Sequence, residues 1–409
     1  MSLEKERMLE DEYVMHTFGR KPVEFVRGSG MRLWDDAGRE YRDFLSGIGV
    51  VSLGHCHPAL VAALADQAAT LMHVSNYYYI EGRGQLARRL SDLLNLTCAE
   101  EERETWQTFF ANSGAEANEC AIKLARLFAK RRAEAAGDEH FPRTVVSLNR
   151  SFHGRTLATL AATAQPVKQE AFQPLPDGFA AVPPNDIDAL ERFFEEHGDE
   201  VCALLIEPVQ GECGVYPCTA EYLQAARRLT SEHGALLMFD EVQCGMFRCG
   251  TYPFAFQHAG VMPDVVTMAK GIAGGVPMGA CAARASVAAV FEPGIHGTTF
   301  GGSNLAIRAA NTVLDTIEAE GIAANVEETG AYLRERLAEL PQVIEVRGLG
   351  LMTAVDLEEG KDANAIVLAA LEAGLVLNAP GPHTLRFLPP LVCTRDDIDY
   401  LVTRLAPLL

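Results

Sequence analysis

The sequence predicts an α/β protein with a large domain, built on a mainly parallel sheet flanked by helices, and a smaller α+β domain formed by both chain ends. From about residue 105 to residue 303, short apolar runs alternate with amphipathic stretches of helical length, as in βαβ units. From residue 304 onward that alternation stops. We therefore expect residues 1–50 to form an arm that is part of the small domain, residues 51–303 the large domain, and residues 304–409 the rest of the small domain.

Each apolar run of the central part predicts one strand. These runs span residues 108–110, 144–148, 201–206, 235–239 and 265–268. One helix is expected to begin near Ser113. A second is expected over residues 219–232, because Leu223, Ala226 and Leu229 recur at helical spacing and Gly234 follows. Strands and helices of these lengths in alternation favour a parallel sheet buried under helices.

The two ends of the chain show different patterns. Residues 304–340 predict a long helix, residues 343–347 and 351–356 a hairpin, and the segment before Gly374 another helix. Thr394 is the expected cap of a last helix. The first 50 residues predict an extended arm with short strands, which we expect to pack against the C-terminal part.

The composition argues against several classes of function. The chain has 35 basic and 55 acidic residues among 409, a formal net charge of −20, which argues against binding nucleic acid or an anionic membrane surface. No apolar run approaches the roughly 20 residues of a membrane span, and the charged N-terminus lacks the apolar core of an export signal. Ten cysteines without framework spacing favour a reducing compartment, so we expect a cytoplasmic protein.

A candidate anion site lies at residues 111–116, where a predicted strand runs into a predicted helix. Ser113 and Glu116 form the S-x-x-E capping pattern, and Gly114 permits close approach to the backbone. Free N–H groups at a helix start bind phosphate. The same pattern also occurs in an ordinary capped helix, so this stretch alone leaves both interpretations open.

Two charged residues follow neighbouring apolar runs and together suggest a cofactor that needs both. Asp240 directly follows the run 235–239, at the strand end where open α/β sheets place their ligands. Lys270 comes just after the run 265–268 and before a glycine-rich turn. A pyridoxal cofactor uses a lysine to hold its aldehyde as an imine and an acid to keep its ring nitrogen protonated.

Two other interpretations are weaker. A zinc hydrolase built on His55 and His57 lacks the further ligands that a zinc site needs, so we expect no metal. A nicotinamide oxidoreductase using Gly82 and Gly84 lacks a convincing strand-to-helix turn around these glycines.

Seven ordered motifs point to one family. They read NSGAEANE (112–119), SFHGRT (151–156), IEPVQGE (206–212), FDEVQCGMFRCG (239–250), TMAKGIAGGVPMGA (267–280), GTTFGGS (297–303) and LRFLPPL (385–391). Together they resemble the class III pyridoxal-phosphate aminotransferases, which have the fold-type I architecture. Within that family they are most similar to the members that act on acetylornithine and ornithine. The resemblance runs from about Tyr13 to the C-terminus.

The resemblance implies pyridoxal 5'-phosphate as cofactor and a role for each residue around its ring. Lys270 matches the lysine that forms the Schiff base, and Asp240 matches the partner of the pyridinium nitrogen. Val242 and Phe152 match the residues on the two faces of the ring. Gln243 matches a residue near the phenolic oxygen.

The resemblance also implies a phosphate site and an assembly. Ser113, Gly114 and Ala115 match the phosphate-binding turn at the helix start. Thr299 matches a threonine that reaches the phosphate across the subunit interface. That match implies a homodimer with a shared active site.

The substrate contacts follow from the same resemblance. Arg386 matches the residue that grips the carboxylate next to the reacting carbon of 2-oxoglutarate or glutamate, and Arg155 matches the residue for the distant carboxylate. Glu207 matches the residue that pairs with Arg386 when the substrate presents its terminal amine, and that swings aside for glutamate. Ile48 stands where ornithine aminotransferases carry a tyrosine, which favours a donor without a free α-amine.

The implied reaction transfers the terminal amine of N-acetyl-L-ornithine to 2-oxoglutarate, giving N-acetylglutamate semialdehyde and glutamate, a step of arginine biosynthesis. Ornithine, 4-aminobutyrate, N-succinylornithine and N-acyl diaminopimelate remain alternative donors. Two departures from the family pattern leave the local geometry open: Phe247 replaces a glycine, and Ser303-Asn304 replaces Asn-Pro.

Overall fold

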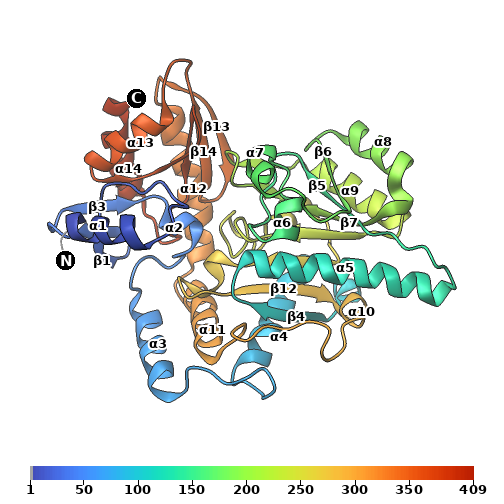
Figure 1. The fold of residues 1–409 in the computed structure, drawn as a ribbon. Coiled ribbons are helices and arrows are strands. Elements are labelled where there is room, and N and C mark those ends of the chain that lie inside the picture. The colour runs from blue at the N-terminus through green and yellow to red at the C-terminus, as the bar shows by residue number, and fades with distance from the viewer. Residues whose placement is uncertain (1–2) are drawn as a thin grey trace.

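The computed structural model describes residues 3–409, and its centre is a seven-stranded sheet. In spatial order the strands are β4 (Trp106–Ala111), β12 (Gly279–Arg284), β11 (Val265–Met268), β10 (Leu236–Asp240), β7 (Val201–Ile206), β5 (Thr144–Leu148) and β6 (Phe179–Val182). Neighbouring strands pair in parallel except where β12 is involved, which runs antiparallel to β11 and to β4. The mainly parallel sheet expected from the sequence is therefore confirmed (Figure 1).

Helices cover both faces of this sheet. Those that contact it are α4 (Arg83–Leu94), α5 (Gly114–Ala136), α6 (Leu157–Ala162), α8 (Ile187–His197), α9 (Ala220–Glu232) and α10 (Ala285–Ala288). In β7, Leu204 and Ile206 pack in the cluster that holds α4, α8 and α9, whereas Ala203 and Leu205 pack in the cluster that holds α5. Because successive side chains point to opposite faces and both faces are buried, the strand is a continuous apolar run.

Most central strands match the expected residues. β5, β7 and β11 span the residues expected from the apolar runs, while β10 begins one residue later and ends at Asp240. The sequence patterns missed β6 and β12. The sequence of β12 is GACAAR, whose small side chains carry little hydrophobic signal although most of the strand is buried.

The two chain ends meet in a second region of the molecule. One sheet joins β1 (Phe25–Ser29), β2 (Arg32–Asp35), β3 (Glu40–Asp43) and β15 (Leu375–Val376); the other joins β13 (Val343–Leu349), β14 (Met352–Leu357), β17 (Thr384–Phe387) and β16 (Asn378–Gly381). β3 and β15 pair in parallel, with Arg42 opposite Leu375. The N-terminal strands therefore pack with the C-terminal part, whereas domain boundaries at residues 50 and 303 stay a prediction.

The remaining elements lie between these sheets or around them. They are α2 (Ser46–Gly49), α3 (Pro58–Thr70), α7 (Pro166–Gln169), β8 (Val209–Gln210), β9 (Tyr216–Pro217), α13 (Ala363–Glu372) and α14 (Arg395–Leu405). Thr394 caps α14 as expected, its hydroxyl accepting from the backbone N–H of Asp397. No helix within residues 3–409 combines the length and the apolar character needed to cross a membrane.

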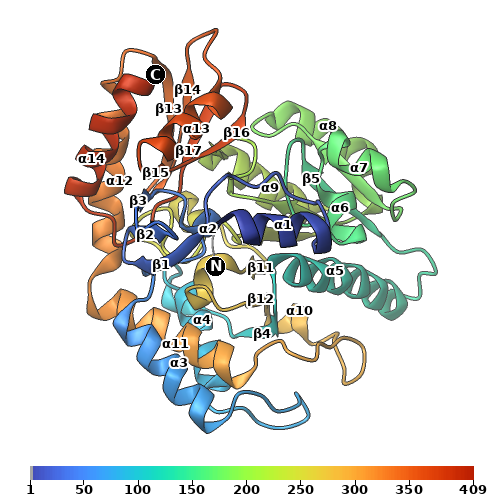
Figure 2. The ribbon, with the colours of Figure 1, turned by 60° about the vertical axis from the view of Figure 1, so that its left-hand side comes forward.

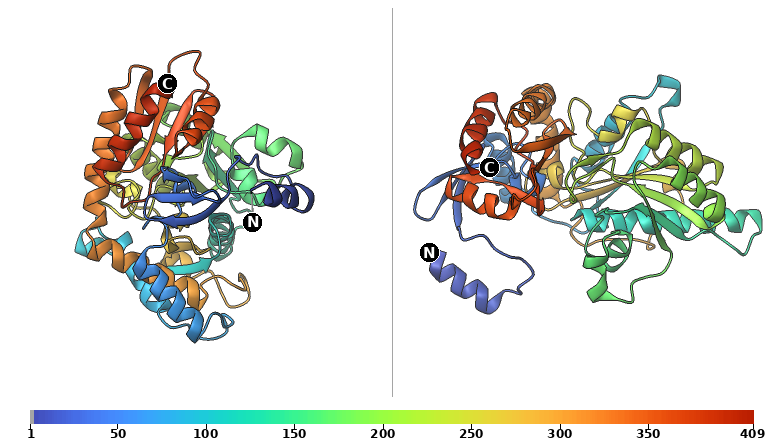
Figure 3. Two further views of the ribbon diagram at one scale, coloured as in Figure 1. Left: turned by 90° about the vertical axis from the view of Figure 1, so that its left-hand side faces the viewer. Right: turned by 90° about the horizontal axis from the view of Figure 1, so that it is seen from above.

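Two expectations for the chain ends were wrong. The long helix over residues 304–340 is two helices, α11 (Asn304–Ala319) and α12 (Ile322–Ala338), because Gly321 adopts a left-handed φ of +63° and breaks the helical hydrogen-bond pattern. Residues 3–13 form a helix, α1 (Leu3–Tyr13), rather than an extended arm. None of the α1 side chains is buried; the helix lies in front of the molecule in the view of Figure 2 and projects from the rest of the chain in Figure 3.

Candidate active site

A cavity of about 450 Å³ opens at the carboxyl ends of β10 and β11. Its wall is formed by residues 112–115 at the start of α5, residues 152–155 after β5, Asp240 and Val242 at the end of β10, and residues 269–270 and 275–278 after β11. Ligands of open α/β sheets bind at this edge, beyond the carboxyl ends of the strands. The cavity therefore brings together the segments that the sequence motifs singled out.

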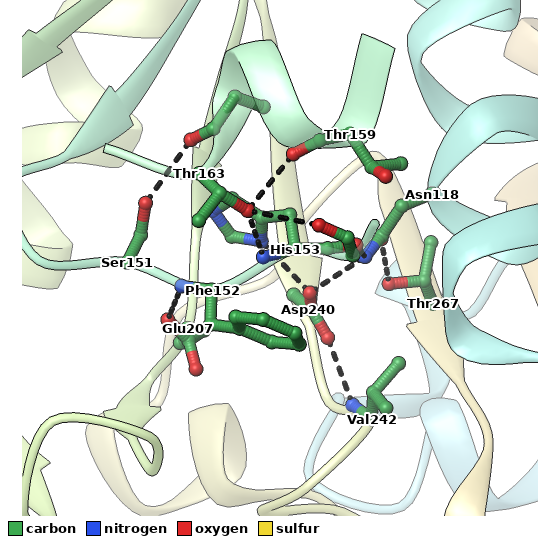
Figure 4. A network of polar contacts seen from close by, with 12 residues as sticks. Asn118, Ser151, Phe152, His153, Thr159, Thr163, Glu207, Asp240, Val242 and Thr267 are labelled. Atoms are coloured by element: carbon green, nitrogen blue, oxygen red, sulfur yellow. Dashed lines mark hydrogen bonds and ion pairs between the residues drawn. The ribbon is translucent and has the colours of Figure 1, made fainter. Parts of the chain in front are cut away.

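The carboxylate of Asp240 is held by three hydrogen bonds although its side chain is only 3% exposed. Oδ2 accepts from Nδ2 of Asn118 at 2.7 Å and from Nδ1 of His153 at 2.8 Å, and Oδ1 accepts from the backbone N–H of Val242 at 3.0 Å (Figure 4). A buried carboxylate needs such donors, because water no longer solvates it. The orientation of Asp240 toward the cavity is thus fixed from three sides.

Asn118 and His153 hold the carboxylate of Asp240, and the sequence patterns assigned no role to either of them. Thr267 on β11 donates to Oδ1 of Asn118 at 2.6 Å, and the backbone N–H of His153 donates to Oγ1 of Thr163 at 2.9 Å. Both residues lie inside quoted motifs, and Asn118 follows Gly114 by one helical turn. That spacing places Asn118 on the face of α5 that begins at the cavity, which is the signal that could have identified it.

Lys270 occupies a strained position beside the cavity. Its backbone φ is +46°, in the left-handed region that side-chain-bearing residues rarely adopt. Such strain is concentrated at functional sites, where the surrounding structure enforces it. Burial lowers the pKa of the Lys270 ammonium, and the carboxylates of Asp240 and Glu207 only partly oppose this effect. A lowered pKa makes the amine a better nucleophile near neutral pH.

The start of α5 forms a close-fitting turn. Oγ of Ser113 accepts from the backbone N–H of Glu116 at 3.2 Å, so the expected cap is present. A Cβ atom at Gly114 would lie 2.8 Å from Cγ1 of Val242, so a larger residue would require Val242 to move. The N–H groups at the very start of a helix have no partner within its backbone, and residues 113–115 line the cavity. This geometry suits an anion such as a phosphate.

Arg386 is buried at the rim of the site, with 2% of its surface exposed. Its guanidinium donates to Oδ1 of Asn378 at 3.0 and 2.7 Å, to the carbonyl of Gly211 at 2.7 Å and to Oε1 of Gln243 at 3.2 Å. The carboxylate nearest to it is that of Glu212, with Nη1 and Oε2 3.7 Å apart. Burial lowers the pKa of Arg386, and Glu212 opposes that effect most strongly.

Glu207 and Arg386 are both among the described residues, and they do not form the expected ion pair. Oε2 of Glu207 accepts from the backbone N–H of Phe152 at 2.9 Å, and Oε1 accepts from that of Gly211 at 3.4 Å. Burial raises the pKa of Glu207 to about 7. Because the Glu207 carboxylate is occupied by backbone donors, Glu212, five residues further along, takes the place at the arginine.

The other expected site residues divide into two groups. Gln243 and Arg155 line the cavity, and within the described chain no carboxylate lies at ion-pair distance from Arg155, which is exposed. Thr299 instead borders a separate hollow together with Tyr77 and Tyr79. Ile48 is 39% exposed and is absent from the lining of the cavity. The substrate roles of Arg155 and Ile48, the phosphate role of Thr299 and the place of Gln243 near the phenolic oxygen of the cofactor remain predictions.

Both departures from the family pattern are accommodated locally. Phe247, which replaces a glycine, keeps a left-handed φ of +65°, and Met246 before it has a φ of +54°. The turn thus retains a conformation in which glycine would be favoured. Ser303 caps α11, its hydroxyl accepting from the backbone N–H of Ala306 at 3.4 Å.

The comparison with known proteins identifies the family. A model of the family described as aminotransferase class-III matches residues 15–409. The chain belongs to this family. As a class III aminotransferase it is similar to the acetylornithine aminotransferase of Thermosynechococcus vestitus, with 47% identity over 95% of this chain and 93% of the relative.

Solved structures give the same result. The ornithine aminotransferase of Toxoplasma gondii, with pyridoxal phosphate at partial occupancy in its active site, matches with a TM-score of 0.90 and 32% identity over 99% of this chain and 94% of that one. The acetylornithine aminotransferase of Elizabethkingia anophelis matches with a TM-score of 0.84 and 30% identity over 100% and 99% of the two chains. The fold class expected from the sequence is thereby confirmed.

Class III aminotransferases use pyridoxal 5'-phosphate, and the residues of this cavity fit that group. The turn at Gly114 suits its phosphate, the carboxylate of Asp240 suits its ring nitrogen, and the amine of Lys270 suits its aldehyde. Val242 and Phe152 both line the cavity. The expected cofactor is thus confirmed at the level of the family, while each residue's contact with it remains a proposal.

The histidines considered for a metal site have structural partners. Nε2 of His55 lies 2.7 Å from Oδ2 of Asp43, and Nε2 of His57 lies 3.2 Å from Oε1 of Glu320. Across residues 3–409, no group of three or more His, Cys, Asp or Glu side chains is arranged to hold a metal ion.

Glu241 directly follows Asp240, and the ionisation of its carboxyl tests how strongly burial near the site disfavours a charge. Its Oε1 accepts from the backbone N–H of Phe256 at 2.9 Å, and burial raises its pKa to about 7. The unfolded chain ionises this carboxyl near pH 4.5. The contribution of the protonated Glu241 carboxyl to the free energy of unfolding is therefore fully present below pH 4.5 and is lost as the pH rises to about 7.

We expect Glu241→Gln, which cannot ionise, to gain stability relative to the wild type as the pH rises from about 4 to about 8, by about 3 kcal/mol in total. Above about pH 8 the difference stays constant. Urea unfolding of the two proteins at several pH values measures it, and Glu358→Gln at the surface serves as the control. A difference that does not change with pH contradicts the assigned burial cost.

Proposed function

We propose that this class III aminotransferase transfers the terminal amine of N-acetyl-L-ornithine to 2-oxoglutarate, giving N-acetylglutamate semialdehyde and glutamate. The observation that carries the proposal is the cavity in which Lys270 and Asp240 converge at neighbouring strand ends, with Arg155 on its wall and Arg386 behind Gln243. Relatives 44–47% identical over nearly the full length carry the name acetylornithine aminotransferase.

The chain's own residues divide the chemistry between them. Bound pyridoxal phosphate supplies an electron-accepting ring that stabilises negative charge on the carbon bearing the amine. Asp240, oriented by Asn118 and His153, keeps a proton on the ring nitrogen. Lys270, whose amine burial favours in the neutral form, accepts the proton that leaves the amine-bearing carbon and delivers it again.

Two arginines and one glutamate let the same cavity accept two differently charged substrates. Arg386 binds the carboxylate beside the reacting carbon of 2-oxoglutarate, and Arg155 binds the distant one, because paired guanidinium hydrogen bonds match carboxylates. When the donor presents a terminal amine, no carboxylate reaches Arg386. Glu212, already 3.7 Å from the guanidinium, then serves as its counter-ion in the role that the sequence assigned to Glu207.

The residue type at position 48 bears on the choice of donor. Ile48, which does not line the cavity of the single chain, offers no polar atom to a free α-ammonium group, so an acylated α-nitrogen would avoid an unpaired charge on binding. Ornithine, 4-aminobutyrate, N-succinylornithine and N-acyl diaminopimelate are the alternatives, and the name of the Toxoplasma structure fits ornithine. Ile48 and the name that the relatives carry, acetylornithine aminotransferase, favour the acylated donor.

A donor panel tests this function. With 2-oxoglutarate as acceptor, we expect kcat/KM for N-acetyl-L-ornithine to exceed that for ornithine and 4-aminobutyrate by about tenfold or more. Glutamate formation is the measured quantity, and Lys270→Ala is the inactive control, with a loss of about 10²–10⁴-fold. A preference for free ornithine would overturn the argument from Ile48.

A second test separates the two half-reactions. Because Arg386 grips a carboxylate only in the acceptor half-reaction, Arg386→Ala should weaken use of 2-oxoglutarate by about 100-fold and the donor half-reaction much less. Single-turnover measurements of each half-reaction give the two values. Arg308→Ala at the surface is the matched control, and equal losses in both half-reactions contradict the role of Arg386.

We also propose a homodimer with a shared active site. Thr299 borders a hollow lined by Tyr77 and Tyr79, which are 95% and 103% exposed in the single chain, and Phe300 beside it is 64% exposed. Exposed aromatic patches of this kind mark protein interfaces. Sedimentation equilibrium should give twice the mass of one chain, and a monomer at micromolar concentration would refute the shared site. All ten cysteines are free, which supports a cytoplasmic location.

A further inference from the structure

Lys168 is a cation beside the active site that no sequence motif singled out. It lies on the short helix α7, with its side chain 20% exposed. Its Nζ donates to Oε1 of Gln165 at 2.7 Å and lies 5.1 Å from the ring centre of Phe152. Its third contact is the carboxylate of Glu212, with Nζ and Oε1 3.3 Å apart.

Glu212 therefore stands between two cations. One oxygen, Oε1, faces Lys168 and the other, Oε2, faces Arg386 at 3.7 Å. The two cations differ in their surroundings, because Arg386 is 2% exposed whereas Lys168 and Glu212 are 20% and 30% exposed. The partners of Arg386 other than Glu212 are neutral oxygens of Asn378, Gly211 and Gln243.

A carboxylate substrate at Arg386 must displace Glu212 from it. Two carboxylates that share one buried guanidinium repel each other, so Glu212 needs another counter-ion when the substrate arrives. Lys168 is already in contact with it, and a rotation within the Glu212 side chain moves its charge from one cation to the other.

We propose that Lys168 is the alternative ion-pair partner of Glu212. It binds the Glu212 carboxylate when Arg386 binds a carboxylate of 2-oxoglutarate or glutamate. Lys168 is thus a positioning residue that acts through Glu212 and sets the balance between the two classes of substrate. This inference rests on the proposed function in one respect only, that a dicarboxylate occupies Arg386 in one half-reaction.

Lys168→Met removes the charge and keeps an unbranched side chain over Phe152. Glu212 is then held by Arg386 alone, so we expect KM for 2-oxoglutarate to rise about fivefold, with kcat and the donor half-reaction nearly unchanged. Lys168→Arg should restore KM, and Lys361→Met, which removes a surface partner of Glu358, is the matched control.

A double-mutant cycle separates this role from two others. In a Glu212→Gln background no charge has to move, so Lys168→Met should change KM for 2-oxoglutarate by less than about twofold. The same fivefold rise in both backgrounds overturns the proposal, because Lys168 would then attract the dicarboxylate directly. Equal losses in both half-reactions overturn it too, because they indicate a structural effect through Phe152.

A failure of the proposed function can be distinguished from a failure of this inference. If the wild type prefers another amine donor, the donor identity is wrong, and the cycle is measured with the preferred donor. If the wild type does not use 2-oxoglutarate or glutamate at all, both proposals fail together.

Discussion

The buried carboxylate of Asp240 is the interaction on which the rest of the site depends. The Asp240 side chain is only 3% exposed, and a buried carboxylate is stable only when its oxygens accept hydrogen bonds. Its donors come from α5, from the loop after β5 and from the turn after β10. Holding this carboxylate therefore holds three segments together, and the same segments supply the helix start at Gly114, the ring of Phe152 and the side chain of Val242.

The acidic net charge of the chain does not carry over to the site. The net charge of −20 describes the molecule as a whole, whereas the cavity is lined by Lys270 and Arg155 as well as by Asp240 and Glu207, with the positive end of α5 at its wall and Arg386 in contact with Gln243. The buried cation needs fixed neutral acceptors and a mobile counter-ion, because its substrate is itself an anion. Glu212 meets the second requirement, since it lies within reach of Arg386 and of Lys168.

The site lies where two parts of the chain meet. Arg386 comes from β17, in the region formed by the C-terminal segment, whereas Gly211 and Gln243, which it contacts, belong to the central α/β part. Ligand sites are common at such junctions, because neither part alone surrounds the ligand. The arginine proposed to bind the acceptor carboxylate thus comes from one part, whereas Lys270 and Asp240, which line the cavity, come from the other.

The features that follow from short-range patterns could be predicted from the sequence alone. The strand ends at Asp240 and Met268, the cap at Ser113 and the parallel sheet were predicted, because apolar periodicity and capping depend on neighbouring residues. Which side chains meet across the chain depends on how the segments pack in three dimensions, and no local pattern reveals it. Asn118 and His153 reach Asp240 through packing between segments, and β12 is buried by its neighbours rather than by its own small side chains. Glu207 and Glu212 stand in one motif, and the choice between them at Arg386 depends on the backbone donors of Phe152 and Gly211, which no local pattern reveals.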